Sequence, residues 1–227
     1  MTFGLLPGTL FRCLLPAGLL CLLSAPAFSY ENDAVTVMSA RLNHNFSNDT
    51  FASVTLNSRW MDLLSETERF IGEIRVGKNI GSHQLSAAYN QHFQRRFLNG
   101  REHRLWQQYR YQHPLATSNL DFRARVEERY FTASNKAGAR TRLVMYWNRP
   151  LANGDLFRLG NELVVNFNNY GNLVRRGFSQ DRLLAGYRHA FANGNRMDIN
   201  YQYRYIHRPA LENIIQHQLQ MLLTFNL

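Results

Sequence analysis

The alternation of apolar and polar residues is clearest at the end of the chain, from Ile214 to Leu227. Alternate side chains in a strand point to opposite faces, so this segment reads as a strand with one apolar and one polar face. The apolar face is Ile215, His217, Leu219, Met221, Leu223 and Phe225. A helical face formed by Leu211, Ile214, Ile215, Leu219 and Leu222 fits the same segment, so the rest of the chain has to decide.

The same period of two recurs from Val35 onward, in segments separated by turn residues. In 120–130, Phe122, Ala124 and Val126 share one face, while a row of charged residues occupies the other, as a strand allows and a helix does not. About eleven such segments can be counted, joined alternately by short and by longer, more basic connections. They are 35–46, 51–60, 68–76, 84–93, 103–113, 120–130, 141–149, 157–167, 183–191, 196–206 and 214–227.

These segments predict an all-β fold: a single antiparallel up-and-down transmembrane β-barrel. Bacterial barrels with both chain ends in the periplasm need an even strand number, so we expect ten strands, with 35–46 outside the wall, or twelve, with one strand missed. The alternation alone does not say which face points inward, and a soluble periplasmic β-barrel binding protein is the alternative. Aromatic residues at strand ends favour the membrane. Gln107 and Glu128 fall on the apolar face, which indicates a place near an interface or a bulge.

The first 29 residues resemble a secretory signal peptide. An apolar run from Cys13 to Leu23 is too short for a spanning helix and leads to small-residue cleavage sites near Ala27. We therefore expect a signal peptide over 1–29, a barrel domain over 30–227, and export to the outer membrane of a Gram-negative cell. Both cysteines, Cys13 and Cys21, lie in the signal, so the mature chain has no thiol for disulfides, catalysis or metal binding.

A net charge of +10 accompanies a row of charged residues on the polar faces of the strands. We interpret the row as a lumen charge ladder, in which guanidinium and carboxylate groups pair across strands. A functional reading is a narrow, positively lined, porin-like pore for small anions. The ladder is Glu73, Arg75, Arg104, Arg110, Arg123, Arg125, Glu127, Arg129, Arg158 and Glu162. No cofactor and no metal ligand set is expected, because the histidines are scattered.

Basic residues between the strands predict contact with lipopolysaccharide phosphates and outer-membrane lipids, and none with nucleic acid. They are Arg95, Arg96, Arg101, Arg175 and Arg176. The closing strand is the expected contact for the barrel-assembly machinery.

An outer-membrane esterase or lipid deacylase is a further alternative, because Ser86, Asn90 and His92 share a strand face and His103 and Glu73 could lie beside them. Ser86 and His92 would be roughly 20 Å apart on one strand, so no catalytic residues are assigned.

Short charged and tyrosine-rich motifs recur along the strands. They are Glu102-His103-Arg104-Leu105-Trp106-Gln107-Gln108, Arg125-Val126-Glu127-Glu128-Arg129-Tyr130, Gly186-Tyr187-Arg188 and Tyr201-Gln202-Tyr203-Arg204. In these motifs the chain resembles an exported bacterial family catalogued as domain of unknown function 2490. The resemblance implies an outer-membrane barrel and no known activity.

Overall fold

The computed structural model describes residues 32–61, 64, 66–94, 101–132, 136–170, 174–208 and 212–227. The signal peptide predicted over 1–29 lies outside these residues, as do Arg95 and Arg96. Within the described ranges, no helix has the length and apolar character needed to cross a membrane.

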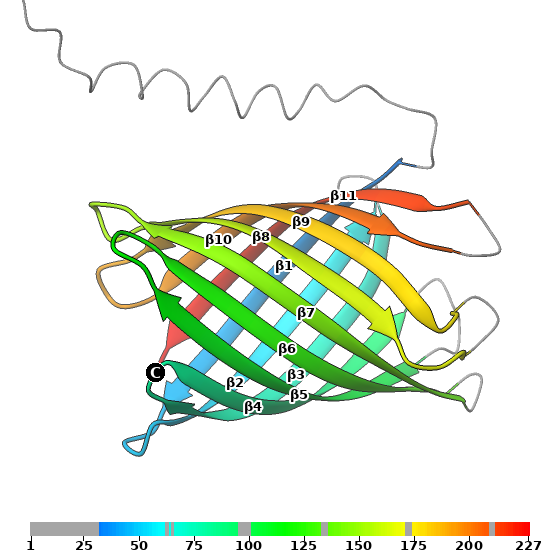
Figure 1. The fold of residues 1–227 in the computed structure, drawn as a ribbon, viewed down its shortest axis with the longest axis horizontal. Coiled ribbons are helices and arrows are strands. Elements are labelled where there is room, and N and C mark those ends of the chain that lie inside the picture. Colours follow the sequence, from blue (N-terminus) through cyan, green and yellow to red (C-terminus); the bar gives the residue numbers. More distant parts are fainter. Residues whose placement is uncertain are drawn as a thin grey trace, which may run out of the picture. The chain divides into compact units, whose positions relative to one another are not determined.

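The described chain forms eleven strands in one closed barrel (Figure 1). The alternating segments therefore are strands, and the helical reading of 214–227 is wrong. The strands are β1 Asn32–Asn45, β2 Thr50–Met61, β3 Glu66–Ile80, β4 His83–Gln94, β5 Arg101–Pro114, β6 Asn119–Phe131, β7 Lys136–Pro150, β8 Leu156–Asn166, β9 Gly177–Ala190, β10 Arg196–Ile206 and β11 Ile214–Asn226. β7 and β9 begin earlier than predicted, so part of each expected connection belongs to the wall.

The barrel closes through a parallel pair, β1 with β11, while each other neighbouring pair is antiparallel. The expectation of ten or twelve strands is therefore wrong, and the direct count of eleven is right. Residues 35–46 belong to a wall strand that pairs with both β2 and β11. An odd number of strands closes when the first and last run in the same direction. Their starts then lie at one end of the barrel and their ends at the other.

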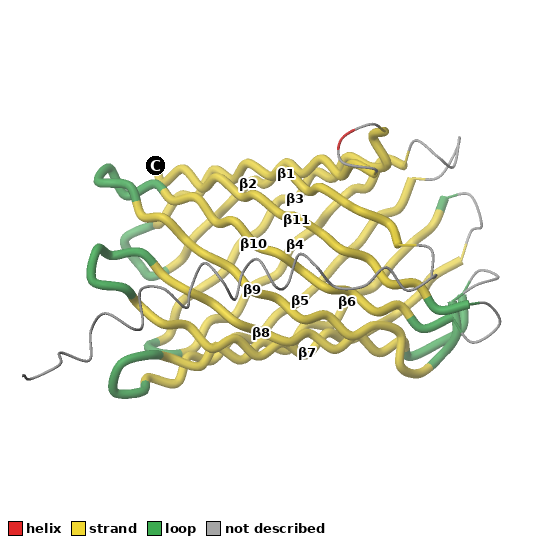
Figure 2. The backbone as a smooth tube through the Cα atoms, turned by 90° about the horizontal axis from the view of Figure 1, so that it is seen from above, coloured by secondary structure: helices red, strands yellow, loops and turns green. Residues whose placement is uncertain are grey.

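The connections at one end of the barrel have two to five residues and those at the other end have four to ten, so the ranges overlap but the first set is shorter on average. The turns after β1, β3, β5, β7 and β9 are short and lie at the end that holds the last residue of the chain; we call this the turn end (Figure 2). The connections after β2, β4, β6, β8 and β10 lie at the opposite, loop end. Two of the turns share the sequence Ala-Asn-Gly, with Gly154 and Gly194 at φ 85° and 81°, a conformation that glycine adopts without strain.

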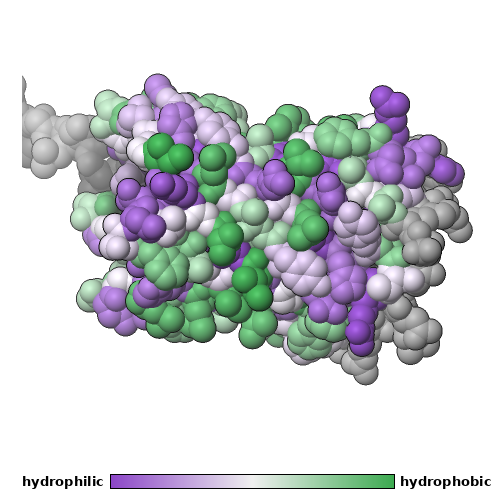
Figure 3. Space-filling view, turned by 90° about the horizontal axis from the view of Figure 1, so that it is seen from below, coloured by the Kyte–Doolittle hydropathy of each residue, from purple (hydrophilic) through white to green (hydrophobic). Residues whose placement is uncertain are grey.

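The apolar face of the strands points outward. Leu56 and Ile74 are 65% and 60% exposed, and apolar side chains spread over the surface in Figure 3, with polar ones among them. Charged groups such as Glu127 and Arg140 are buried on the inside. Gln107 and Glu128 do face outward, and neither pairing of β6 contains a register shift, so the explanation by a bulge is wrong.

Candidate functional site: the arginine-lined lumen

The inner wall encloses a cavity of about 650 Å³ that reaches from the loop end into the middle of the barrel. Its lining contains twelve arginines and only two glutamates, Glu68 and Glu127. The arginines are Arg41, Arg59, Arg69, Arg104, Arg125, Arg129, Arg140, Arg142, Arg175, Arg182, Arg204 and Arg208. Such an excess of cations inside low-dielectric walls attracts anions.

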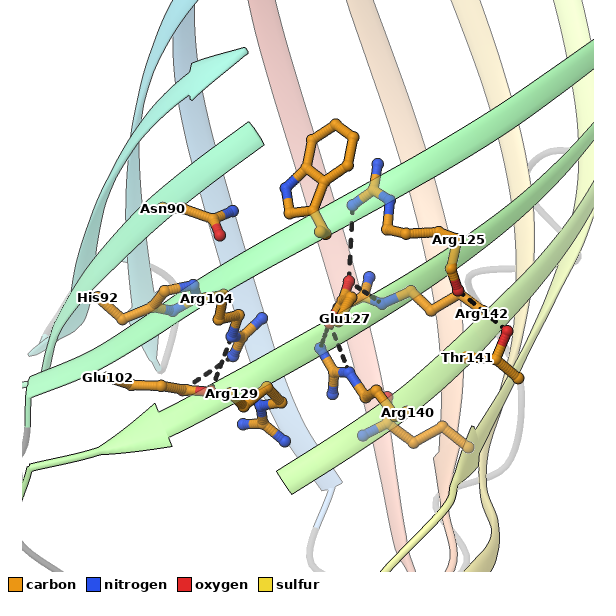
Figure 4. A network of polar contacts seen from close by, with 12 residues as sticks. Asn90, His92, Glu102, Arg104, Arg125, Glu127, Arg129, Arg140, Thr141 and Arg142 are labelled. Carbon is orange, nitrogen blue, oxygen red and sulfur yellow. Dashed lines mark hydrogen bonds and ion pairs between the residues drawn. The ribbon is translucent and has the colours of Figure 1, made fainter. Parts of the chain in front are cut away.

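Glu127 of β6 is the centre of one cluster of ion pairs (Figure 4). Its carboxylate is 1% exposed and lies 2.5 Å from Nη2 of Arg140 and 2.7 Å from Nε of Arg142. Arg125 Nη1 lies 3.6 Å away and its guanidinium stacks over the Trp106 ring at 3.9 Å. The strand register brings these groups together. Arg140 lies directly opposite Glu127, and Arg142 lies two residues further along β7, on the same face. One carboxylate thus holds three arginines in fixed positions.

A second buried carboxylate, Glu102, joins β5 to β6. Arg104 donates to both of its oxygens at 2.8 and 2.9 Å, and Arg129 also donates to it. Arg129 contacts the hydroxyl of Tyr170, which comes from the β8–β9 connection and is 3% exposed. Tyr170 lies where Gly138 leaves room, because a Cβ on Gly138 would stand 2.4 Å from the ring. The loop-end mouth is therefore partly filled by a tyrosine bound to the wall.

The opposite wall, formed by β9, β10 and β11, carries amides in place of carboxylates. Arg204 donates to Gln180 Oε1 at 3.1 Å and to Gln216 Oε1 at 3.0 Å. Arg182 and Arg59 donate to the same two oxygens. Arg182 and Arg59 also have glutamate partners, Glu162 and Glu68, whereas Arg204 forms no ion pair with a carboxylate of the described chain. Its charge is therefore the least compensated on this wall.

Toward the turn end the lumen is held by a further set of pairs. Asp121 is fully buried and accepts two hydrogen bonds from Arg110, at 2.9 and 2.8 Å, and two from Arg123, at 3.1 and 2.7 Å. Arg188 Nε lies 2.8 Å from Asp198. These arginines are bound to carboxylates and do not line the cavity, so they serve to hold the wall together.

All ten residues of the predicted ladder lie on the inner wall, but they do not form one row. Glu127 with Arg125 and Glu102 with Arg104 and Arg129 belong to separate clusters, and Arg75 donates instead to Gln84 at 2.6 Å. Arg158 donates to Asn148, and Glu73 accepts from Asn90.

Sequence reasoning missed several lumen residues: Glu102, Arg140, Arg142, Arg182, Arg204 and the glutamines Gln180, Gln202, Gln216, Gln218 and Gln220. The alternation extended past the predicted strand ends would have found Glu102 and Arg140. The glutamines carry no charge, so the pattern of charged residues did not indicate them.

The residues considered for an esterase are not assembled. Ser86 lies opposite Gly77 and Gln108, and its hydroxyl has no hydrogen-bond partner among the described residues. His103 faces outward and pairs with the hydroxyl of Tyr89 at 2.5 Å, so its predicted place beside Ser86 is wrong. Glu73 does lie beside Asn90, which donates to it at 2.9 Å. No histidine base therefore contacts a serine nucleophile at this face in the described chain.

Three of the five basic residues predicted to contact lipopolysaccharide are described. Arg101 begins β5, and Arg175 and Arg176 precede β9; all three are exposed at the loop end. Arg175 also lines the cavity mouth. The described residues contain no group of three histidine, aspartate or glutamate side chains able to hold a metal ion.

These features define the class: a closed β-barrel with an apolar outer surface and a charged, arginine-rich lumen. Residues 38–214 match the model of the family described as protein of unknown function (DUF2490), so the chain belongs to this family, as its motifs predicted. Neither the curated proteins nor the solved structures contain a match to it.

Proposed function

We propose that the protein is an integral outer-membrane β-barrel whose lumen is a narrow pathway for small anions. The observation that carries this proposal is the lining of the cavity, with twelve arginines against two glutamates. Arginine rings select anions in pores, because a guanidinium replaces part of the hydration that an anion loses on entry. Eleven strands fall between barrels filled by side chains and open porins, which suits small solutes only.

The membrane setting is supported by the orientation of the faces. Large apolar side chains are exposed on the outer surface, including Leu56, Ile74, Leu105, Leu183 and Leu219. A soluble barrel would bury these residues, since an apolar surface of this extent is rare in soluble monomers. The connections are shorter on average at the turn end, with two to five residues against four to ten, as the periplasmic end of outer-membrane barrels has.

Contact with outer-membrane lipids follows from this setting. At the loop end, Arg101 and Arg176 are exposed and can meet the phosphates of lipopolysaccharide, as would Arg175 at the mouth. The last strand, β11, is the segment that the assembly machinery would bind. Cell fractionation tests the location, and a shift in gel mobility between unboiled and boiled protein tests the folded membrane barrel.

Conductance in planar bilayers tests the pathway. We expect small single-channel currents with a reversal potential that indicates anion preference. Arg204→Gln removes a lumen cation that has no carboxylate partner in the described chain and should reduce this preference severalfold. Arg149→Gln is the matched control, because it removes the same charge from an exposed position at the turn end, where Arg149 contacts Thr117.

A wild-type protein that inserts into the bilayer but carries no current overturns the pathway. The barrel then has a structural or binding role. Equal effects of Arg204→Gln and Arg149→Gln would also count against it, because the selectivity would then reflect the charge of the whole surface.

A further inference from the structure

We propose that the cavity binds a small anion that also carries hydroxyl groups, such as a sugar acid or a sugar phosphate. This inference rests on the proposed function and names the class of solute. It comes from two sets of polar groups that face each other across the cavity: hydrogen-bond donors on β9–β11, and an unpaired donor and acceptor on β4.

The first set offers donors. Gln180 and Gln202 use their amide oxygens as acceptors, toward Arg204 and Gln220 respectively, so that wall turns N–H groups to the cavity. Arg204 adds a guanidinium that no carboxylate of the described chain neutralises. Donors of this density suit carboxylate or phosphate oxygens, which accept several charge-assisted hydrogen bonds at once.

The second set lies on β4. Asn90 is 7% exposed and donates its amide nitrogen to Glu73, which leaves the amide oxygen as an acceptor without a partner in the described chain. His92 is 2% exposed, and its Nδ1 lies 3.5 Å from Nη1 of Arg69. Arginine only donates, so Nδ1 is the acceptor and a neutral imidazole carries its proton on Nε2, which has no partner either.

An unpaired acceptor and an unpaired donor thus stand two residues apart on one strand face, and both residues line the cavity. A buried polar group without a partner costs about 1–3 kcal/mol, so such pairs mark places where a ligand binds. A fully deprotonated oxyanion such as sulfate accepts only and cannot satisfy the amide oxygen of Asn90. A hydroxyl group donates and accepts, so it can satisfy both. The cavity of about 650 Å³ also falls in the range of small-molecule sites.

Calorimetric titration of the purified barrel in detergent tests this inference. The probes are glucuronate, glucose 6-phosphate, glucose and inorganic sulfate. We expect glucuronate or glucose 6-phosphate to bind at least tenfold more tightly than either glucose or sulfate. Comparing the two sugar anions shows whether the carboxylate or the phosphate is preferred.

Two lumen variants separate the contributions. Arg204→Gln should lower the affinity for every anion, whereas Asn90→Leu should lower only the affinity for the hydroxylated anions, by about tenfold. Gln91→Leu is the control, because Gln91 follows Asn90 on the same strand and faces outward. His92→Phe replaces Asn90→Leu as the test if the latter does not give the gel mobility of a folded barrel.

Equal affinity for sulfate and the sugar anions would overturn the inference, as would no binding of any probe or an equal effect of Gln91→Leu. The titration measures binding independently of conductance. Selective binding without conductance would reject only the anion pathway, and conductance without selective binding would reject only the proposed class of solute.

Discussion

Met38 lies directly opposite Met221 across the parallel seam of β1 and β11, and both side chains belong to the outer face. This relationship fixes the strand number, because a barrel of ten strands without β1 in the wall would pair β11 with β2. Met38→Cys combined with Met221→Cys should therefore form a disulfide on mild oxidation, with neighbouring strands about 4.8 Å apart. Gel mobility with and without reductant measures it.

The register control is Met38→Cys with Leu222→Cys. This pair differs by one residue and points to opposite faces of the wall, so it should not cross-link. Cross-linking of the control pair but not of Met38 with Met221 would reject the register of the seam.

The parallel seam also predicts where the strand ends lie. β1 starts at the loop end, where the exposed Arg176 also lies, while Ser47 lies in the turn after β1 at the opposite end. Single cysteines at Ala34 and Arg176 should thus be labelled from the same side of the membrane, and a cysteine at Ser47 from the other. A membrane-impermeant maleimide on intact and opened cells measures this. A ten-stranded barrel with 35–46 outside the wall would instead place Ala34 on the same side as Ser47.

Glu127→Gln should destabilise the barrel strongly. Among the described residues, Glu127 is the only carboxylate paired with Arg140, at 2.5 Å, and one of two paired with Arg142. A broken buried ion pair costs about 3–5 kcal/mol. The free energy of unfolding in urea, followed by tryptophan fluorescence in lipid vesicles, measures the loss. Glu212→Gln changes an exposed carboxylate outside the wall and should stay within about 0.5 kcal/mol of the wild type.

Asp155, in the turn between β7 and β8, should make stability depend on pH. Its carboxylate accepts hydrogen bonds from the Tyr187 hydroxyl, from Ala190 N–H at 3.0 Å and from Asn153 at 2.5 Å, and these hold its pKa below the ordinary value of 3.8. A depressed pKa stabilises the folded state fully above the ordinary value, and this stabilisation is lost as the pH falls through the folded-state pKa.

Asp155→Asn should therefore lower the urea midpoint at pH 7, and its difference from the wild type should shrink as the pH falls below 3.8. Urea titrations at a series of pH values measure this. A difference that stays constant over the series would show that the charge of Asp155 plays no part.

The amino-acid sequence by itself determined the strands and which residues of a strand share a face. Alternation is a local property, so the faces of 120–130 could be assigned without knowledge of any neighbour, and Arg125 and Glu127 were placed correctly on one face. The family membership also follows from the sequence.

Only the tertiary structure decided the closure and the site. The expectation of an even strand number argued against eleven strands. Nothing in the sequence around Met38 reveals that β1 pairs in parallel with β11 or that Met38 lies opposite Met221. Likewise, pairing across strands was predicted for Glu127, but its main partners, Arg140 and Arg142 of β7, were not among the predicted residues. Register across strands decides which charges meet, and register depends on the closed sheet as a whole.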